Sequence, residues 1–242
     1  MTDSRSDEVS ATLRKVWEEH TDESYRRDQS HWKGQGRWSD EKWEAVGQGT
    51  VKRLTRIFGP HRPHPWLRAA PVVLEWGPGG GSNLHALAPH ATVLYGVDIS
   101  QQNLQETERV LRMQHPQVDF HAILLRENPA EVLERVLQPV DIFVSTAVFQ
   151  HFPSQQYGAD VLNVVGRLCA KGCVGLIQIR FDNGNPKYTS KDFAEYERLH
   201  ITATSYELSA FWDLCRAAGL RPVSIFDINT TNNYAYVAFT KG

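Results

Sequence analysis

The chain has 242 residues, of which 41% are hydrophobic and 22% are charged. This is the composition of an ordinary globular domain, and it excludes disordered, collagen-like, coiled-coil and disulfide-scaffold proteins. The formal net charge of −2 lacks the basic excess of a general nucleic-acid binder, so the composition disfavours a nucleic-acid partner.

The first residues of the chain, its longest apolar stretch and its cysteines predict a protein of the cytoplasm. The first ten residues are polar, and the longest nearly apolar stretch, residues 140–149, is too short to span a membrane. The three cysteines, Cys169, Cys173 and Cys215, are odd in number and have no CxxC spacing. We therefore expect reduced core thiols, a cytoplasmic location, no membrane partner and no metal site.

The first 70 residues differ from the rest because they contain five of the seven tryptophans and show helical periodicity. The pattern predicts helices over residues 9–19 and 40–58, with Ser39 at the start of the second. The sequence GPHRPHP at residues 59–65 cannot continue a helix. Residues 1–70 are therefore expected to form a helical, aromatic-rich cap that precedes a separate domain, residues 71–242.

From residue 71 onward, short apolar segments alternate with helical patterns. The predicted strands cover residues 71–76, 92–100, 118–125, 141–149, 172–181, 222–229 and 234–241. The predicted helices cover residues 82–89 (capped by Ser82), 101–113, 129–137, 155–169 and 205–218. This alternation predicts a doubly wound α/β fold with a mostly parallel sheet that ends in an antiparallel hairpin.

A glycine-rich loop follows the first predicted strand. It reads Glu-Trp-Gly-Pro-Gly-Gly-Gly over residues 75–81, and Asp98 ends the second predicted strand 21 residues after Gly77. Ligands of such sheets bind at the carboxyl ends of the strands, where a carboxylate accepts hydrogen bonds from ribose hydroxyls. A nicotinamide dinucleotide site would place its third glycine at position 82, which is Ser82 here.

The acid, the three spaced glycines and the later Asp98 resemble the first motifs of the class I S-adenosylmethionine-dependent methyltransferases. The resemblance covers about residues 70–242 and implies their seven-stranded sheet and S-adenosyl-L-methionine as cofactor. It also implies that Glu75 holds the methionine ammonium, that Asp98 binds the ribose and that Ile99 packs on the adenine. The cofactor-binding residues that it implies are Glu75, Gly77, Gly79, Gly81, Asp98, Ile99 and Phe149.

The resemblance also implies that the end of the fourth strand faces the reacting methyl group. Phe149, Gln150 and His151 lie there in the sequence. A histidine can accept a proton near neutral pH, so His151 is the candidate catalytic base. The alternative is a structural histidine that caps the following helix. The residue that contacts the adenine amine is left open between Glu127, Asn128 and a backbone carbonyl.

The aromatic segment near the amino terminus is the candidate substrate-binding region. Aromatic rings can stack on a ring-shaped substrate and an arginine can bind a carboxylate, while Gly34 and Gly36 would let the segment close as a lid. The alternative is that the tryptophans only pack the extension onto the domain. The candidate substrate residues are Tyr25, Trp32, Arg37 and Trp38, with Arg180, His200 and Tyr206 as weaker candidates.

These observations favour methyl transfer to an oxygen or nitrogen of a small-molecule metabolite, such as an intermediate of a natural-product pathway. Two alternatives remain open, a non-catalytic S-adenosylmethionine-binding protein and a nicotinamide-dependent reductase, the latter disfavoured by Ser82. The sequence leaves the acceptor and the oligomeric state undecided, with a homodimer as one alternative.

Overall fold

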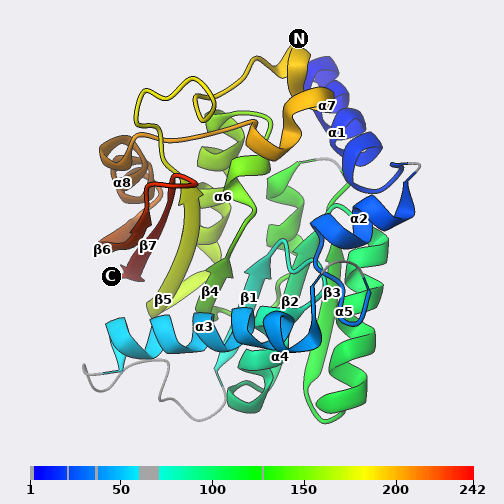
Figure 1. Cartoon of the computed structure of the whole chain (residues 1–242). Coiled ribbons are helices and arrows are strands. Elements are labelled where there is room, and N and C mark those ends of the chain that lie inside the picture. Colours follow the sequence, from blue (N-terminus) through cyan, green and yellow to red (C-terminus); the bar gives the residue numbers. More distant parts are fainter. Residues whose placement is uncertain (1–2, 21, 36–37, 60–70, 127) are drawn as a thin grey trace.

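A seven-stranded sheet forms the centre of the molecule (Figure 1). The computed structural model describes residues 3–20, 22–35, 38–59, 71–126 and 128–242. The strands are β1 (Val72–Trp76), β2 (Val93–Asp98), β3 (Asp119–Leu124), β4 (Val140–Ser145), β5 (Cys169–Arg180), β6 (Leu220–Asn229) and β7 (Tyr234–Lys241). They are ordered β3-β2-β1-β4-β5-β7-β6, and β7 is antiparallel to both of its neighbours. The doubly wound, mostly parallel fold expected from the sequence is confirmed.

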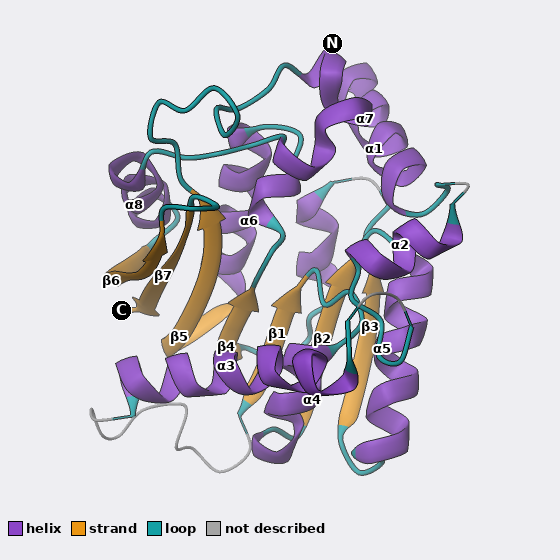
Figure 2. Cartoon of the chain, in the orientation of Figure 1, coloured by secondary structure: helices purple, strands orange, loops and turns teal. Residues whose placement is uncertain are grey.

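Helices cover both faces of this sheet (Figure 2). The α-helices are α1 (Asp3–Trp17), α2 (Glu23–Gln29), α3 (Asp40–Phe58), α4 (Ser82–Leu87), α5 (Gln101–Gln114), α6 (Gln155–Leu168), α7 (Tyr196–Leu199) and α8 (Leu208–Ala217). The 3₁₀ turns are η2 (Ala88–His90), η3 (Pro129–Glu134), η4 (Phe149–His151), η5 (Phe193–Glu195) and η6 (His200–Thr202). Within the described ranges, none of the helices is long and apolar enough to cross a membrane.

The two faces of the sheet form two hydrophobic cores, because successive side chains of a strand point to opposite faces. Leu74 of β1 belongs to the core that α6 and α8 cover. Its neighbour Val73 belongs to the core that α3, α4 and α5 cover, to which α3 contributes Leu54 and Phe58. Helix α3 is therefore part of the layer that supports the sheet.

Helices α1, α2 and α7 lie beyond the carboxyl ends of the parallel strands (Figure 1). There Leu13 and Val16 of α1 pack on Tyr196 of α7 and on Ala203 in a small third cluster. The indole nitrogen of Trp17 donates a hydrogen bond to the Tyr196 hydroxyl over 3.0 Å. Two segments far apart in the sequence therefore cover this end of the sheet, the amino-terminal helices and the segment after β5.

Several local expectations differ from the structure. Strand β4 ends at Ser145 rather than at residue 149, because Ala147 adopts a positive φ of 57° and the chain turns into η4. The segment after β3 forms the 3₁₀ turn η3 instead of an α-helix. Ser82 does not cap α4, since Gly81 occupies the cap position and the Ser82 hydroxyl donates to the Trp43 carbonyl over 2.6 Å. Ser39 does cap α3, as expected.

Candidate active site

The glycine loop between β1 and α4 adopts backbone conformations that favour glycine. Gly77, Gly79 and Gly81 have φ values of 76°, 53° and 82°. A Cβ atom on Gly77 would lie 2.3 Å from the Val148 side chain, so no other residue fits there without a shift. The Gly77 amide donates to the Val97 carbonyl over 2.7 Å. The loop is thereby held against the end of β2, where Asp98 follows.

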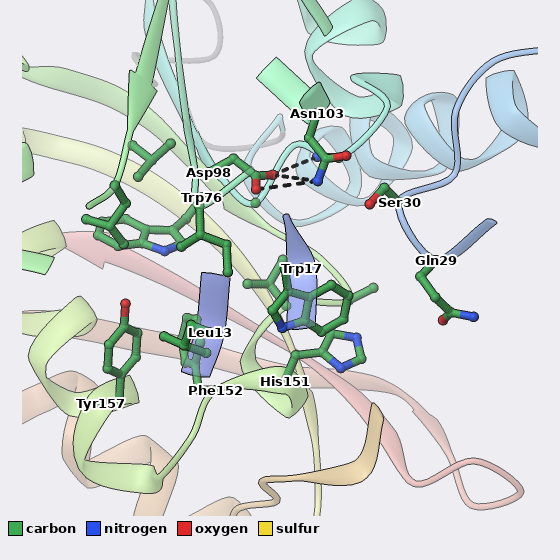
Figure 3. A pocket seen from close by; sticks show the side chains of 17 residues that line it. Leu13, Trp17, Gln29, Ser30, Trp76, Asp98, Asn103, His151, Phe152 and Tyr157 are labelled. Carbon is green, nitrogen blue, oxygen red and sulfur yellow. Dashed lines mark hydrogen bonds between the residues drawn. The ribbon is translucent and has the colours of Figure 1, made fainter. Parts of the chain in front are cut away.

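Asp98 is buried at the end of β2, with its carboxylate turned toward the glycine loop. Its oxygens accept hydrogen bonds from the Ser100 amide at 2.9 Å and from the Gly79 amide at 3.4 Å. The Asn103 side-chain amide lies 3.4 Å from both oxygens (Figure 3). Burial raises the pKa of Asp98 to about 6, and the hydrogen bonds oppose this rise. The carboxylate is thus oriented, while three of these four hydrogen bonds are long.

Glu75 is a second buried acid, one strand away on β1. One of its oxygens accepts a hydrogen bond of 2.6 Å from the Asn83 amide, whereas Oε2 has no partner. Burial raises the pKa of Glu75 to about 8, and the nearby Asp98 charge contributes to the rise. A buried carboxyl group with an unsatisfied oxygen is costly unless a cation or donor meets it. This position therefore suits a positively charged ligand group.

Two adjoining cavities open around the loop. The narrower one, about 100 Å³, has Asp98 at one side and apolar walls that include Ile99, Leu125 and Trp17 (Figure 3). The larger one, about 640 Å³, is lined by Glu75, among other residues, and extends toward β5 and β7. The residues that line both cavities are Gln29, Ser30, Gly77, Gly79, Ala147 and His151. The two cavities therefore meet at the glycine loop and at His151.

His151 is held in one tautomer at this meeting point. Its Nδ1 lies 3.0 Å from the His200 carbonyl, which only accepts, so the ring proton sits on Nδ1. Nε2 is left as an acceptor, and the Gln150 amide nitrogen lies 3.2 Å from it. Trp17 packs on the imidazole with 4.9 Å between ring centroids. Burial lowers the pKa of His151 to about 3, so the ring is neutral at physiological pH.

The segment after α2 closes over the glycine loop. The Gly80 amide donates to the Ser30 carbonyl over 2.7 Å. The Trp32 indole nitrogen donates to the Asn103 side chain over 3.0 Å, and Asn103 in turn contacts Asp98. This amino-terminal segment is therefore connected by hydrogen bonds both to the loop and to the carboxylate of the narrower cavity.

The other sequence-predicted residues have three outcomes. Trp38 lines the larger cavity, whereas Arg37 and Glu127 lie outside the described residues. The remaining candidates line neither cavity and contact neighbouring groups or cap helices. Tyr25 hydrogen-bonds His200, Trp32 reaches Asn103, Gly81 caps α4, Tyr206 packs on Phe211, Arg180 contacts Tyr234, and Asn128 caps η3.

Phe149, which was expected among the cofactor-binding residues, lines neither cavity. Because β4 ends four residues early, the Phe149 ring turns into the core and packs against Phe152 and Phe211. Ala147 and Val148 line the narrower cavity in its place. Only the polar Ser145 and Thr146 interrupt the apolar residues of 142–149 at this turn, and apolar residues follow them, so the strand was expected to continue.

Sequence reasoning also missed residues that line the cavities. Gln29 and Ser30 belong to a short helical segment with no apolar periodicity, and Leu13 was considered only as part of a helix. Gln178 accepts a hydrogen bond from the Ala147 amide over 2.9 Å and faces the larger cavity. Among the residues with described positions, no group of three or more potential ligands is placed to hold a metal ion.

Comparisons with known proteins place this fold and site in context. Residues 74–174 match a family model described as a methyltransferase domain. No curated protein matches the chain.

Three solved structures illustrate the likeness in fold. One is magnesium protoporphyrin IX methyltransferase from Synechocystis PCC 6803 with bound SAM, with 14% identity, 97% of each chain covered and a TM-score of 0.64. The N-methyltransferase NodS from Bradyrhizobium japonicum WM9 has 14% identity over 84% of this chain and 99% of that chain, with a TM-score of 0.54. An S-adenosylmethionine-dependent methyltransferase from Clostridium acetobutylicum ATCC 824 has 10% identity over 81% and 99% of the two chains, with a TM-score of 0.55.

Proposed function

We propose that this chain, whose residues 74–174 match a methyltransferase domain, is a class I S-adenosylmethionine-dependent methyltransferase that methylates an oxygen or nitrogen of a small-molecule metabolite bound in the larger cavity. The observation that carries this proposal is the place of His151, which lines both cavities and has an acceptor nitrogen, Nε2. A natural-product intermediate is one such metabolite.

The buried acids fit the cofactor. Asp98, with its three long hydrogen bonds, would accept hydrogen bonds from the ribose hydroxyls, and Ile99 and Leu125 would contact the adenine. The unpartnered Oε2 of Glu75 would meet the methionine ammonium. When bound, S-adenosylmethionine supplies an electrophilic methyl group, so the protein's own part is to position the acceptor and take up its proton.

His151 suits an oxygen acceptor in particular. A hydroxyl that gains a methyl group holds its proton as a strongly acidic oxonium, so even an imidazole with a pKa of about 3 can accept that proton. An amine acceptor becomes an ammonium group, which retains its proton against such a weak base. The hydrogen bond from Nδ1 to the His200 carbonyl leaves the lone pair on Nε2, which would exchange its contact with the Gln150 amide for the acceptor hydroxyl in this step.

The amino-terminal segment supports the role of a cap. We assign the cap function expected of residues 1–70 to α1, α2 and the loop that leads to Trp38, because α3 belongs to the core of the sheet. Gln29 and Ser30 of this segment line both cavities, and Trp38 lines the larger one. Such a cap would keep water away from the methyl group during transfer.

The test of this proposal is His151→Ala. Turnover of small hydroxyl acceptors should fall by roughly 10²–10⁴-fold, the range for one acid–base group. It is measured with methyl-labelled S-adenosylmethionine and a panel of hydroxyl and amine compounds. Affinity for S-adenosylhomocysteine should change little, because the side chain would face the acceptor.

The pH profile adds a second readout. An unperturbed imidazole would take up a proton near pH 6.5, and turnover would fall below that pH. Because the folded structure lowers the pKa of His151 to about 3, the turnover of the parent enzyme should not depend on His151 titration near pH 6.5. Near-parental turnover in the alanine variant would remove His151 from catalysis. An absence of methyl transfer to every compound, with tight cofactor binding, would favour the non-catalytic alternative.

A further inference from the structure

Arg180 is a buried cation at the carboxyl end of β5, and its side chain is 4% exposed. Its guanidinium donates to the Ile201 carbonyl over 3.0 Å and to the Tyr234 hydroxyl over 2.7 Å. It also lies 5.2 Å and 5.0 Å from the ring centroids of Tyr188 and Tyr234. Its Nε has no hydrogen-bond partner. All of its contacts are thus with neutral groups.

The positive charge of Arg180 has no anionic partner in the part of the chain that the structure describes, since none of the ion pairs found there includes it. Burying a charge without a counter-charge is costly. A second arginine–tyrosine pair at the same cavity differs in that its arginine has an acidic partner. Arg53 lies 4.2 Å from the Tyr236 ring centroid, but it forms an ion pair of 2.9 Å with Asp227, a carboxylate that it shares with Arg56.

The uncompensated charge lies directly behind the wall of the larger cavity. Ile201 and Tyr234, the two residues to which Arg180 donates, both line that cavity. Because the Tyr234 oxygen accepts the bond from Arg180, its own hydrogen is left to donate elsewhere. A donor polarised by a cation favours an anionic acceptor. The Arg180 charge is also felt at His151, whose pKa burial lowers most and Arg180 lowers further.

We propose that the molecule methylated by this enzyme carries an anionic oxygen group, a carboxylate or a phosphate ester, and that this group accepts a hydrogen bond from the Tyr234 hydroxyl, which Arg180 polarises from behind the cavity wall; this inference rests on the function proposed above. Strand β7 lies two strands from β4, after which His151 follows. Neighbouring strands are about 4.8 Å apart, so the anionic group should lie on the order of 10 Å from the methylated atom. Tyr234 is then a specificity-determining residue.

The test is a binding measurement that needs no turnover. The full-length protein, saturated with S-adenosylhomocysteine, is titrated with benzoate, phenyl phosphate and neutral benzamide at constant ionic strength. At least one anion should bind the parent about tenfold or more tightly than benzamide, as expected of a charge-assisted hydrogen bond. A preference for benzoate identifies a carboxylate site, and a preference for phenyl phosphate identifies a phosphate site.

Two matched variants assign the preference to its residue. Tyr234→Phe keeps the ring beside Arg180 but removes the hydroxyl, so the anion preference should fall to about threefold or less. Tyr236→Phe removes a hydroxyl from the same cavity beside the ion-paired Arg53, and it should keep the preference. Equal binding of all three compounds by the parent, or an unchanged preference in Tyr234→Phe, would overturn the inference. An intact preference in a protein that methylates nothing would refute only the proposed function.

Discussion

At the scale of single residues, the loss of folding stability that the site causes arises mainly from the buried carboxyl group of Glu75. This side chain is 1% exposed, one of its oxygens is unpartnered, and the buried Asp98 carboxylate lies on the neighbouring strand. A core without ligand requirements would contain a neutral residue at this position, because burial of a charge is unfavourable. The acid therefore makes sense as a binding group for a cation, maintained at the expense of the stability of the ligand-free protein.

Glu75→Gln should separate these two effects. Folding raises the pKa of Glu75 from 4.5 to about 8, so the stabilising neutral form is fully present below pH 4.5 and is lost as the pH rises through about 8. The ligand-free parent should thus lose stability between pH 6 and about pH 8 and level off above that pH, whereas Glu75→Gln should not show this loss. A difference of a few kcal/mol corresponds to a melting-temperature gain on the order of 5 °C or more for the variant at pH 9.

The melting temperature is measured across this pH range with and without S-adenosylmethionine. The cofactor should stabilise the parent more than the variant, because only the parent presents a carboxylate to the ammonium. Glu134→Gln, which changes an exposed carboxylate, is the control and should follow the parent. Identical pH slopes for the parent and Glu75→Gln would show that Glu75 is charged in the ligand-free protein.

At the scale of elements, the sequence predicts the positions of those helices and strands whose side chains are buried in a regular pattern. Apolar runs located β1 and β7, and the spacing of Trp43, Leu54 and the other buried residues of α3 gave its full length. Helix α2 has no buried residue, so no periodic pattern marks it. The end of β4 was missed because apolar residues resume at Ala147, whose positive φ ends the strand direction.

The same reasoning applies to the site. Glu75, Gly77 and Asp98 could be predicted because their chemistry depends on residue type and spacing along one βαβ unit. The closure of the amino-terminal segment could not, because it depends on backbone atoms. The bond from the Gly80 amide to the Ser30 carbonyl uses groups that every residue but proline provides. The Arg180–Tyr234 pair was missed because the two residues become neighbours only through the antiparallel register of β5 and β7.

Gly80→Ala tests the contact between α2 and the glycine loop. An added Cβ atom would lie 2.3 Å from the His31 carbonyl oxygen and 2.8 Å from the Trp32 Cα, so the segment must move away. Loss of one hydrogen bond, about 1 kcal/mol, should raise the dissociation rate of S-adenosylhomocysteine roughly five- to tenfold. Stopped-flow tryptophan fluorescence measures this rate.

The control for this variant is Gly49→Ala on α3. Gly49 lines the same cavity, but an added Cβ atom would meet only the flexible end of Arg53. Alanine is also favourable inside a helix. This variant should release the cofactor at the parental rate. A parental rate in Gly80→Ala, with unchanged melting temperature, would mean that the segment does not control cofactor release.

At the scale of the whole molecule, the structure combines a self-supporting sheet layer with a cap that belongs to the site. The two cores on the faces of the sheet draw residues from α3 onward, whereas α1 packs only in the third cluster, with Tyr196 and Ala203. The cap therefore contacts the loop of residues 192–204 more than it contacts the sheet. It adds few apolar contacts to the fold, yet it supplies walls to both cavities.

Deletion of residues 1–38 tests this division, because the new chain would begin at Ser39, the cap of α3. Loss of the buried Leu13 and Val16 should cost about 3–6 kcal/mol at most, and Tyr196 should become exposed. Far-UV circular dichroism should still show a cooperative transition at a lower melting temperature. Turnover should be almost abolished, because water would reach the reacting atoms. Faster proteolysis should be confined to residues 185–204. A truncated chain without a cooperative transition would show instead that α1 and α2 complete the core, and their role would then be structural before it is catalytic.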